Sequence, residues 1–398
     1  MRNILFLLLL GFISQVYAQW PQWRGPNRDG FSTETNLLKT WPAEGPTLLW
    51  SSDKIGKGNA SAIIQNKMIY VAGTRDSIDI ITAFGLKGNL IWQKEYGKTF
   101  SPPPGGWEQQ RSTPTFYKNK LYYFTVSGII SCLNSRTGNL DWTINIPGKF
   151  KGTSDDAFTE SPLIVDDKII LTLCEKNTTL IALNTSTGET IWASEGIDDE
   201  RRYTSPVLIE VKDKKLIVTS TINYCLAVNL NTGKIVWKEK TTTTPIPLPG
   251  NKQIYFSSLE NGGKMLNISD DLNCFNYKWC DSLKIKEFGG PVKLGNRIFG
   301  TYEMGAGIFC LDWETGKQLA FNKGIRGANL VAADGMIYSY EEKNGRVSLL
   351  KPTDNNIEVA GSFKVEGKGP HLAHMSLGNG MLFVRHGEVL MAYNIKRQ

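Results

Sequence analysis

Asn184-Thr185-Ser186-Thr187-Gly188-Glu189-Thr190-Ile191-Trp192 is the stretch that decides the fold, because the chain repeats it. Its core is Asn or Asp, two residues, Thr-Gly, three residues and Trp. Copies of this motif lie at Asn134…Thr137-Gly138…Trp142 and Asn229…Thr232-Gly233…Trp237, with Ala320 in place of Trp after Asp312…Thr315-Gly316 and a shortened form at Gly88…Trp92.

The residue types of the motif predict a hairpin. An Asn or Asp side chain accepts a backbone N–H two residues on, and Gly adopts the left-handed conformation that closes a short turn. The residues after Gly alternate as in a strand. A small residue stands six positions before each Gly and leaves room for an indole opposite it, so we interpret the motif as packing machinery and not as a site. These small residues are Cys132, Ala182, Ala227 and Cys310.

The Trp residues recur every 42 to 50 residues at Trp50, Trp92, Trp142, Trp192, Trp237 and Trp279. A period near 40–50 residues with four short strands per unit is typical of a propeller blade. Turn signals define eight units, and the last one stops after Asn394 without its fourth strand. The stretch Thr47–Ser51, with Trp50, supplies that strand from the other end and removes the free edge.

We therefore predict an all-β fold, an eight-bladed β-propeller of four-stranded antiparallel blades over residues 47–398, whose ring is closed by an N-terminal strand that completes the last blade. Aromatic residues make up 11% of the chain and support the all-β class. Because units five and seven are degenerate, seven blades plus an irregular segment is the alternative. Residues 19–46, which begin Trp20-Pro21-Gln22-Trp23, are expected to form an irregular ordered arm.

Residues 1–18 have the pattern of a secretory signal peptide: Arg2, an apolar run from Ile4 to Ile13, and Val16-Tyr17-Ala18 before the cleavage point. No Cys follows the apolar run to carry a lipid, and no later stretch is long enough to span a membrane. We expect a periplasmic or secreted protein without a lipid anchor, and a monomer.

The composition argues against several classes of site. The net charge of +7 comes from scattered residues, which gives no nucleic-acid signature, and three His are too few for an obvious metal cluster. Four of the six Cys fall in apparent strands and are expected to be buried free thiols: Cys132, Cys174, Cys225 and Cys310. Only Cys274 and Cys280, which flank an irregular segment, are considered as a disulfide pair.

The repeat Ala-x-Asn-x-x-Thr-Gly-x-x-x-Trp resembles the tryptophan-docking repeat of the pyrroloquinoline-quinone (PQQ) propeller superfamily, over about residues 45–398. The resemblance implies two branches. Quinoprotein dehydrogenases oxidise alcohols or sugars with PQQ and Ca²⁺; BamB-like propellers carry no cofactor. The adjacent Cys-Cys pair of many dehydrogenases is absent from this chain. The opening Trp20-Pro21-Gln22-Trp23-Arg24-Gly25-Pro26 is similar to the start of secreted PQQ-like repeat proteins.

Residues just before the innermost strands are expected to gather at one mouth of the central channel. The candidate ligand or partner site there comprises Trp107, Arg111, Glu160, Arg202, Tyr203, Arg326, His371 and His374. Alternatively, Arg111, Glu160 and Arg202 pair with one another and seal the channel. His374 is either a general base or a hydrogen-bonded structural residue, and Trp107 either stacks on a ligand or plugs the funnel.

From this pattern we expect a non-catalytic binding or scaffold protein of the cell envelope, similar to BamB, that holds an envelope protein, an extended peptide or a polar ligand at the funnel. No enzyme activity, catalytic residue, cofactor or metal is expected. One alternative is a quinoprotein-type dehydrogenase that uses PQQ and Ca²⁺. A further alternative is a carbohydrate-binding propeller.

Overall fold

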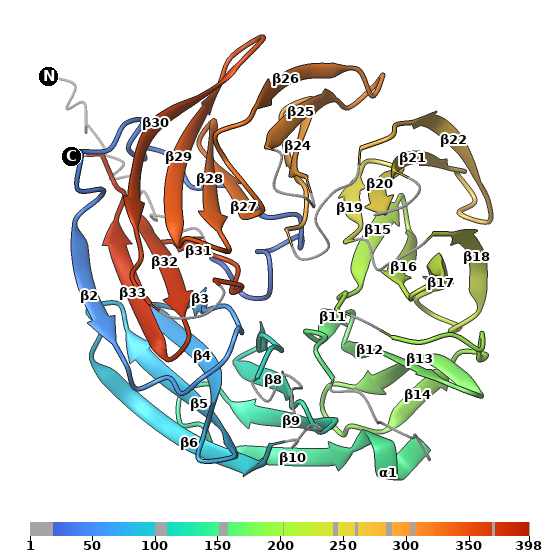
Figure 1. Ribbon diagram of the computed structural model, residues 1–398. Coiled ribbons are helices and arrows are strands. Elements are labelled where there is room, and N and C mark those ends of the chain that lie inside the picture. Colours follow the sequence, from blue (N-terminus) through green and yellow to red (C-terminus); the bar gives the residue numbers. More distant parts are fainter. Residues whose placement is uncertain are drawn as a thin grey trace, which may run out of the picture.

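Eight twisted sheets surround a central channel in the computed structural model (Figure 1), which describes residues 19–99, 110–150, 158–201, 203–241, 246–258, 262–283, 289–302, 307–367 and 371–397. Each sheet is one blade, with its first strand nearest the channel. Blades 1 to 4 contain β3 (Ile63–Gln65), β4 (Met68–Arg75), β5 (Ile78–Gly85) and β6 (Leu90–Lys98); β7 (Thr115–Tyr117), β8 (Lys120–Phe124), β9 (Ile129–Asn134) and β10 (Leu140–Asn145); β11 (Leu163–Val165), β12 (Lys168–Glu175), β13 (Thr178–Asn184) and β14 (Thr190–Ala193); and β15 (Val207–Val211), β16 (Lys214–Ser220), β17 (Tyr224–Asn229) and β18 (Ile235–Lys240).

Blades 5 to 8 complete the ring. They contain β19 (Leu248–Gly250), β20 (Gln253–Ser258), β21 (Gly262–Ile268) and β22 (Phe275–Cys280); β23 (Val292–Leu294), β24 (Arg297–Thr301), β25 (Ile308–Asp312) and β26 (Gln318–Asn322); β27 (Ala328–Ala333), β28 (Met336–Glu341), β29 (Arg346–Pro352) and β30 (Ile357–Lys364); and β31 (Ser376–Gly378), β32 (Met381–His386), β33 (Val389–Asn394) and β2 (Leu48–Ser52). A five-residue helix, α1 (Ile146–Phe150), follows blade 2.

The ring closes as predicted. Strand β2 pairs antiparallel with β33 and places Trp50 opposite Ala392, so the N-terminal segment completes the blade that the C-terminus leaves unfinished. Figure 1 shows the blue β2 beside the red β33. The propeller fold with eight blades is confirmed, and the seven-bladed alternative is wrong.

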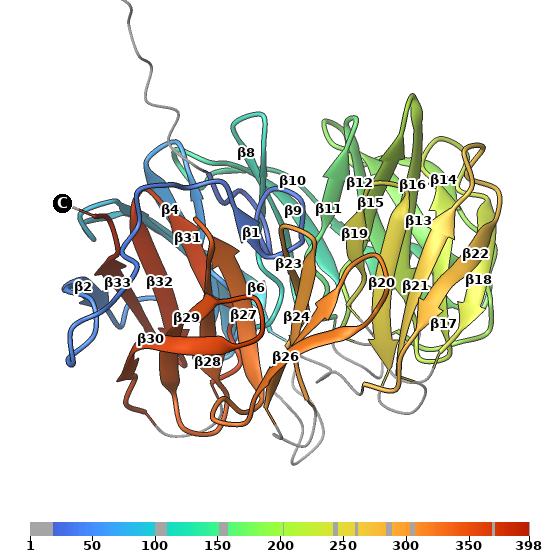
Figure 2. The same cartoon turned by 90° about the horizontal axis from the view of Figure 1, so that it is seen from above.

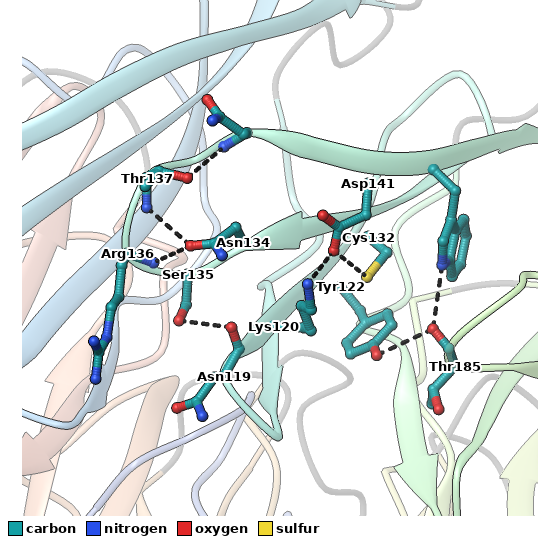
Figure 3. Close-up of polar contacts among 12 residues, drawn as sticks. Asn119, Lys120, Tyr122, Cys132, Asn134, Ser135, Arg136, Thr137, Asp141 and Thr185 are labelled. Atoms are coloured by element: carbon teal, nitrogen blue, oxygen red, sulfur yellow. Dashed lines mark hydrogen bonds and ion pairs between the residues drawn. The ribbon is translucent and has the colours of Figure 1, made fainter.

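The repeated motif forms the expected turn, shown for blade 2 in Figure 3. The side-chain oxygen of Asn134 accepts the amides of Arg136 and Thr137 at 3.0 and 3.2 Å. Gly138 has a φ of 69°, the left-handed value that the turn requires. Asn184 and Asn229 accept amides two and three residues on in the same way.

Each well-formed copy also ties its blade to the next one, because its Trp lies over the Gly of the following blade. A Cβ on Gly233 would collide with the ring of Trp192, and Nε1 of Trp192 donates to the Leu230 carbonyl at 2.9 Å. Within its own blade Trp192 stands opposite Ala182, as the small-residue spacing predicts. The same donation joins Trp50 to Leu86, Trp92 to Ser135, Trp142 to Thr185 and Trp279 to Trp313.

The ring compensates where the motif is degenerate. In blade 5 Leu272, with φ 65°, has the left-handed conformation that Gly has in the other copies. Trp237 therefore has no Gly to cover and packs edge-on against Phe275, with the ring centroids 5.1 Å apart. In blade 7 Gly361 occupies the position of the missing Trp, opposite Leu349. Trp41 from the N-terminal arm packs over Gly361 and fills the space.

The arm before β2 runs through the middle of the ring (Figures 1 and 2). It consists mainly of turns and bends, with one short strand, β1 (Phe31–Ser32), that pairs in parallel with β27 and makes blade 7 five-stranded. Trp20 exchanges two backbone hydrogen bonds with Ile64 of blade 1, each of 2.9 Å, and is fully buried. The arm is thus a packed part of the channel.

The six cysteines are free thiols. Cys132, Cys225 and Cys310 are buried in strands, and Cys174 is partly buried. Cys274 and Cys280 are exposed at opposite ends of β22, and an extended strand of that length holds them roughly 20 Å apart, too far for a disulfide.

Replacing Trp192 by Ala should lower the free energy of unfolding by about 3–5 kcal/mol, because it removes a buried indole that spans two blades. Urea denaturation followed by circular dichroism measures the loss. The matched control is Ile191→Ala, whose side chain is 44% exposed on the same strand and should change stability by less than about 0.5 kcal/mol. Equal losses in the two variants would contradict the packing role of the indole.

Candidate functional site

A cavity of about 160 Å³ opens at one mouth of the channel. Its wall comes mostly from the segments that enter the innermost strands, and blades 1 to 5 and 8 each contribute at least one such residue. Blade 7 contributes Glu342, from the turn between β28 and β29. The lining residues are Trp23, Asn59, Arg111, Thr159, Ser161, Tyr203, Ser205, Ile246, Glu342, Leu372 and His374.

Trp23 is the one lining residue that comes from the arm. Its ring packs edge-on against His374, with the ring centroids 5.5 Å apart, and the guanidinium carbon of Arg24 lies 5.7 Å from its centroid. Trp23 is 8% exposed, so one face of the indole forms part of the cavity surface while the rest is packed.

Arg28 fixes the arm inside the channel. Its side chain is 1% exposed, and Nη1 donates to the carbonyls of Ser161 and Pro206, each at 3.0 Å, while Nη2 donates to that of Pro162. One guanidinium therefore ties the arm to blades 3 and 4. A second cavity, of about 330 Å³, is lined by arm residues 26–29 and by the first strands of blades 3 to 5. The arm thus lies between two separate cavities.

Hydroxyl groups connect the wall of the first cavity from blade to blade. The amide of Ser61 donates to Oγ1 of Thr113 at 2.9 Å, the amide of Thr113 to Oγ of Ser161 at 2.9 Å, and the amide of Ser161 to Oγ of Ser205 at 3.0 Å. These bonds satisfy buried amides at the point where four blades meet the arm, and they give the wall a fixed shape.

Three of the sequence-predicted residues meet in this cavity: Arg111, Tyr203 and His374. The guanidinium carbon of Arg111 lies 5.6 Å from the centroid of the Tyr203 ring, a cation–π arrangement. Trp107 and Arg202 lie outside the described residues. The functional role of the set remains a prediction.

Glu160 does not line the cavity, although Thr159 and Ser161 do. Alternation along the extended chain turns its side chain into blade 3, where both carboxylate oxygens accept the Thr172 amide at 2.9 and 3.2 Å. Burial raises the pKa of Glu160 to about 8, against the smaller opposing effects of the Thr172 hydrogen bonds and of Arg28 and Arg201. The carboxyl group is therefore mostly protonated at neutral pH.

His371 and Arg326 also lie away from the cavity wall. His371 is buried, stacks on His386 with a centroid separation of 3.9 Å, and its Nδ1 is 2.5 Å from the Tyr340 hydroxyl. Burial, with a smaller effect of His386, lowers the pKa of His371 to about 4. Arg326 is exposed.

The donor set of the cavity fits Ca²⁺ poorly. Calcium takes six to eight oxygen ligands, several of them carboxylates. Of the lining residues that the structure describes, Glu342 is the one carboxylate. Within the described part of the chain no three His, Cys, Asp or Glu side chains lie close enough to hold a metal ion.

Sequence reasoning missed eight of the lining residues: Trp23, Asn59, Thr159, Ser161, Ser205, Ile246, Glu342 and Leu372. Asn59, Ile246 and Leu372 precede innermost strands as Arg111 does, but they carry neither the charge nor the aromatic ring that marks a candidate binding residue in a sequence. Trp23 belongs to a segment without repeats, whose path no periodicity predicts.

Comparison with known proteins places the chain among propellers of this repeat. The family model described as outer membrane protein assembly factor BamB matches residues 31–239 and 77–319. A curated relative, outer membrane protein assembly factor BamB of Salmonella typhimurium strain LT2, is 26% identical over 160 residues; the match covers 40% of this chain and 36% of that protein.

Solved structures share the fold. BamB from Moraxella catarrhalis superposes with a TM-score of 0.65 at 15% identity, covering 88% of this chain and 98% of that one. Quinohemoprotein alcohol dehydrogenase from Comamonas testosteroni gives a TM-score of 0.67 at 11% identity, covering 96% and 81%. At these identities the likeness shows the fold and leaves the activity open.

The raised pKa of Glu160 predicts a pH dependence of stability. The unfolded chain loses this proton near pH 4.5 and the folded protein near pH 8, so ionisation opposes folding and stability falls between these values. Glu160→Gln keeps an oxygen for the Thr172 amide and does not ionise. The melting temperature of wild type minus that of Glu160→Gln should therefore decrease from about pH 5 to about pH 8.

Glu388→Gln, at an exposed glutamate, is the matched control for replacing one carboxyl group by an amide. A difference between wild type and Glu160→Gln that stays constant across this range would show that the folded protein does not hold the proton.

Proposed function

The chain belongs to the family of PQQ-repeat propellers described as outer membrane protein assembly factor BamB, and we propose that it is a non-catalytic binding protein of the cell envelope that holds a partner polypeptide at the mouth of its funnel. The curated relative is named as an assembly factor, and a role in bringing envelope proteins together is what we carry over to this chain.

The observation that carries the proposal is the shape and lining of the cavity at the funnel mouth. Trp23 of the arm lines this cavity and arm residues 26–29 line the second one, so we interpret the first cavity as a docking pocket at the funnel mouth. Apolar surface from Trp23, Ile246 and Leu372 lies beside Arg111 and Tyr203. Aromatic and Arg residues in a largely apolar setting are the composition of protein–protein contact centres.

An envelope location agrees with the predicted signal peptide, although residues 1–18 lie outside the described part of the structure. Among the residues that the structure describes, no helix has the length and apolar character needed to cross a membrane.

The dehydrogenase alternative remains the second hypothesis from the sequence. It requires PQQ and Ca²⁺ in the funnel, where Glu342 is the one carboxylate among the described residues of the cavity wall. The poor fit of these residues to Ca²⁺ favours the binding role.

Site-specific photo-crosslinking in living cells tests the proposal. A photoreactive amino acid in place of Tyr203, which is 36% exposed and lines the cavity, should give a discrete cross-linked product with an envelope protein. The matched control replaces Tyr277, which is 51% exposed on the outer strand β22, and should give none.

Equal products from both positions would show that the funnel is not the binding surface. A saturable rise in melting temperature on adding PQQ with Ca²⁺, accompanied by dye-linked alcohol or sugar oxidation, would replace the proposed function with the dehydrogenase.

A further inference from the structure

Positive charge is buried in the channel beneath the first cavity. Arg24 and Arg28 are each 1% exposed. Their hydrogen bonds go to Gln22 and to backbone carbonyls, among them those of Asp29, Pro206 and Pro291, and never to a carboxylate. Burial lowers the pKa of Arg24 to about 10 and of Arg28 to about 9, so both guanidinium groups keep their charge at neutral pH.

Nearby carboxyl groups do not cancel this charge. Glu160 acts on Arg28 electrostatically but is mostly protonated at neutral pH, because burial raises its pKa to about 8. Asp29 acts on Arg24, and its own pKa is raised by burial, against the effects of the Phe31 amide and of Arg24. Among the described residues, Glu160 and Asp29 are the carboxyl groups that act on these two cations, and burial raises the pKa of both, which weakens their neutralisation of the guanidinium charge.

Arg24 also has an unused donor. Its Nη2 is bonded to Asp29 and Pro291, but Nη1 has no hydrogen-bond partner although it is buried. A buried guanidinium N–H without an acceptor is costly, so such a donor calls for a partner.

The unused donor lies near a wall residue of the first cavity, although Arg24 itself is not one of the lining residues. Gly290, with φ 56°, leaves the space for it: a Cβ there would collide with Nη1 and lie 3.3 Å from Cδ1 of Ile246. Ile246 lines the cavity, as does Trp23, over which the Arg24 guanidinium lies. Arg24 therefore lies next to the segment that enters blade 6. Among the described residues, this blade alone adds none to the cavity wall.

The rim of the cavity adds a third cation. Arg111 lies over Tyr203 in the wall, next to the apolar side chains of Ile246 and Leu372. Glu342 opposes these charges from blade 7. The cavity has a volume of about 160 Å³ and opens at the channel mouth, which leaves room for a side chain of an extended peptide.

We infer that this cavity, as the docking point of the proposed function, takes an acidic side chain of an extended peptide, whose carboxylate is attracted by Arg111 and Arg24 and whose apolar neighbours contact Ile246 and Leu372. A carboxylate is the acceptor that a guanidinium binds best, and charge complementarity selects it over a neutral amide of the same shape.

Two capped peptides test the inference by calorimetry on the full chain: Gly-Phe-Glu-Phe-Gly and the same sequence with Gln for Glu. Wild type should bind the Glu peptide about tenfold more tightly than the Gln peptide, with a preference that shrinks as salt is added. Arg111→Gln should abolish most of the preference, and Arg24→Gln should do the same if the variant folds. Glu342→Gln should increase the affinity for the Glu peptide.

Arg326→Gln is the matched control, since it removes an exposed arginine outside the cavity and should leave the preference unchanged. Equal binding of both peptides to wild type would contradict the preference for an acidic side chain, but not peptide binding at the funnel. A loss of preference in Arg326→Gln as large as that in Arg111→Gln would contradict it in the same way. No binding of either peptide would also overturn the inference. The proposed function is tested separately, by the cross-linking at Tyr203.

Discussion

The central part of the molecule depends on the hydrogen bonds that the buried guanidinium group of Arg28 donates to backbone carbonyls. A charge in the interior is expensive unless its hydrogen bonds are made, and here the carbonyls of Ser161, Pro162 and Pro206 supply them. These acceptors belong to two different blades. The arm is therefore held at a fixed place in the channel, and the position of Trp23, five residues earlier, follows from it.

Ring and site are built in different ways. The ring comes from a repeated device, in which a Trp of one blade covers the Gly turn of the next and its indole N–H is satisfied across the interface. The site combines loops that enter the innermost strands with Trp23, which comes from a segment that occurs once. The arm also repairs the ring, since Trp41 fills the space above Gly361 and β1 extends blade 7. One segment thus completes both the fold and the cavity.

The sequence was sufficient for the ring because every feature of the repeat has a local cause. Asn134 and Gly138 form a turn by themselves, and Trp50 identifies the closing strand by its similarity to the other Trp positions. The cavity could be predicted from the sequence only in part. Arg111, Tyr203 and His374 were found because they precede innermost strands. Trp23 and the unused donor of Arg24 depend on where a non-repeating segment runs, which long-range hydrogen bonds to distant blades decide.

Hydrogen–deuterium exchange of the full chain tests most directly whether the arm is a fixed part of the channel. The amides of Trp20, Arg28 and Gly30 donate to backbone carbonyls in this structure, at 2.9, 3.2 and 2.9 Å. They should exchange as slowly as those of the core strand β4. Exchange as fast as that of the exposed turn at residues 66–67 would show that the arm opens freely. Neither Trp23 as a fixed part of the cavity wall nor the buried charge of Arg24 and Arg28 would then stand.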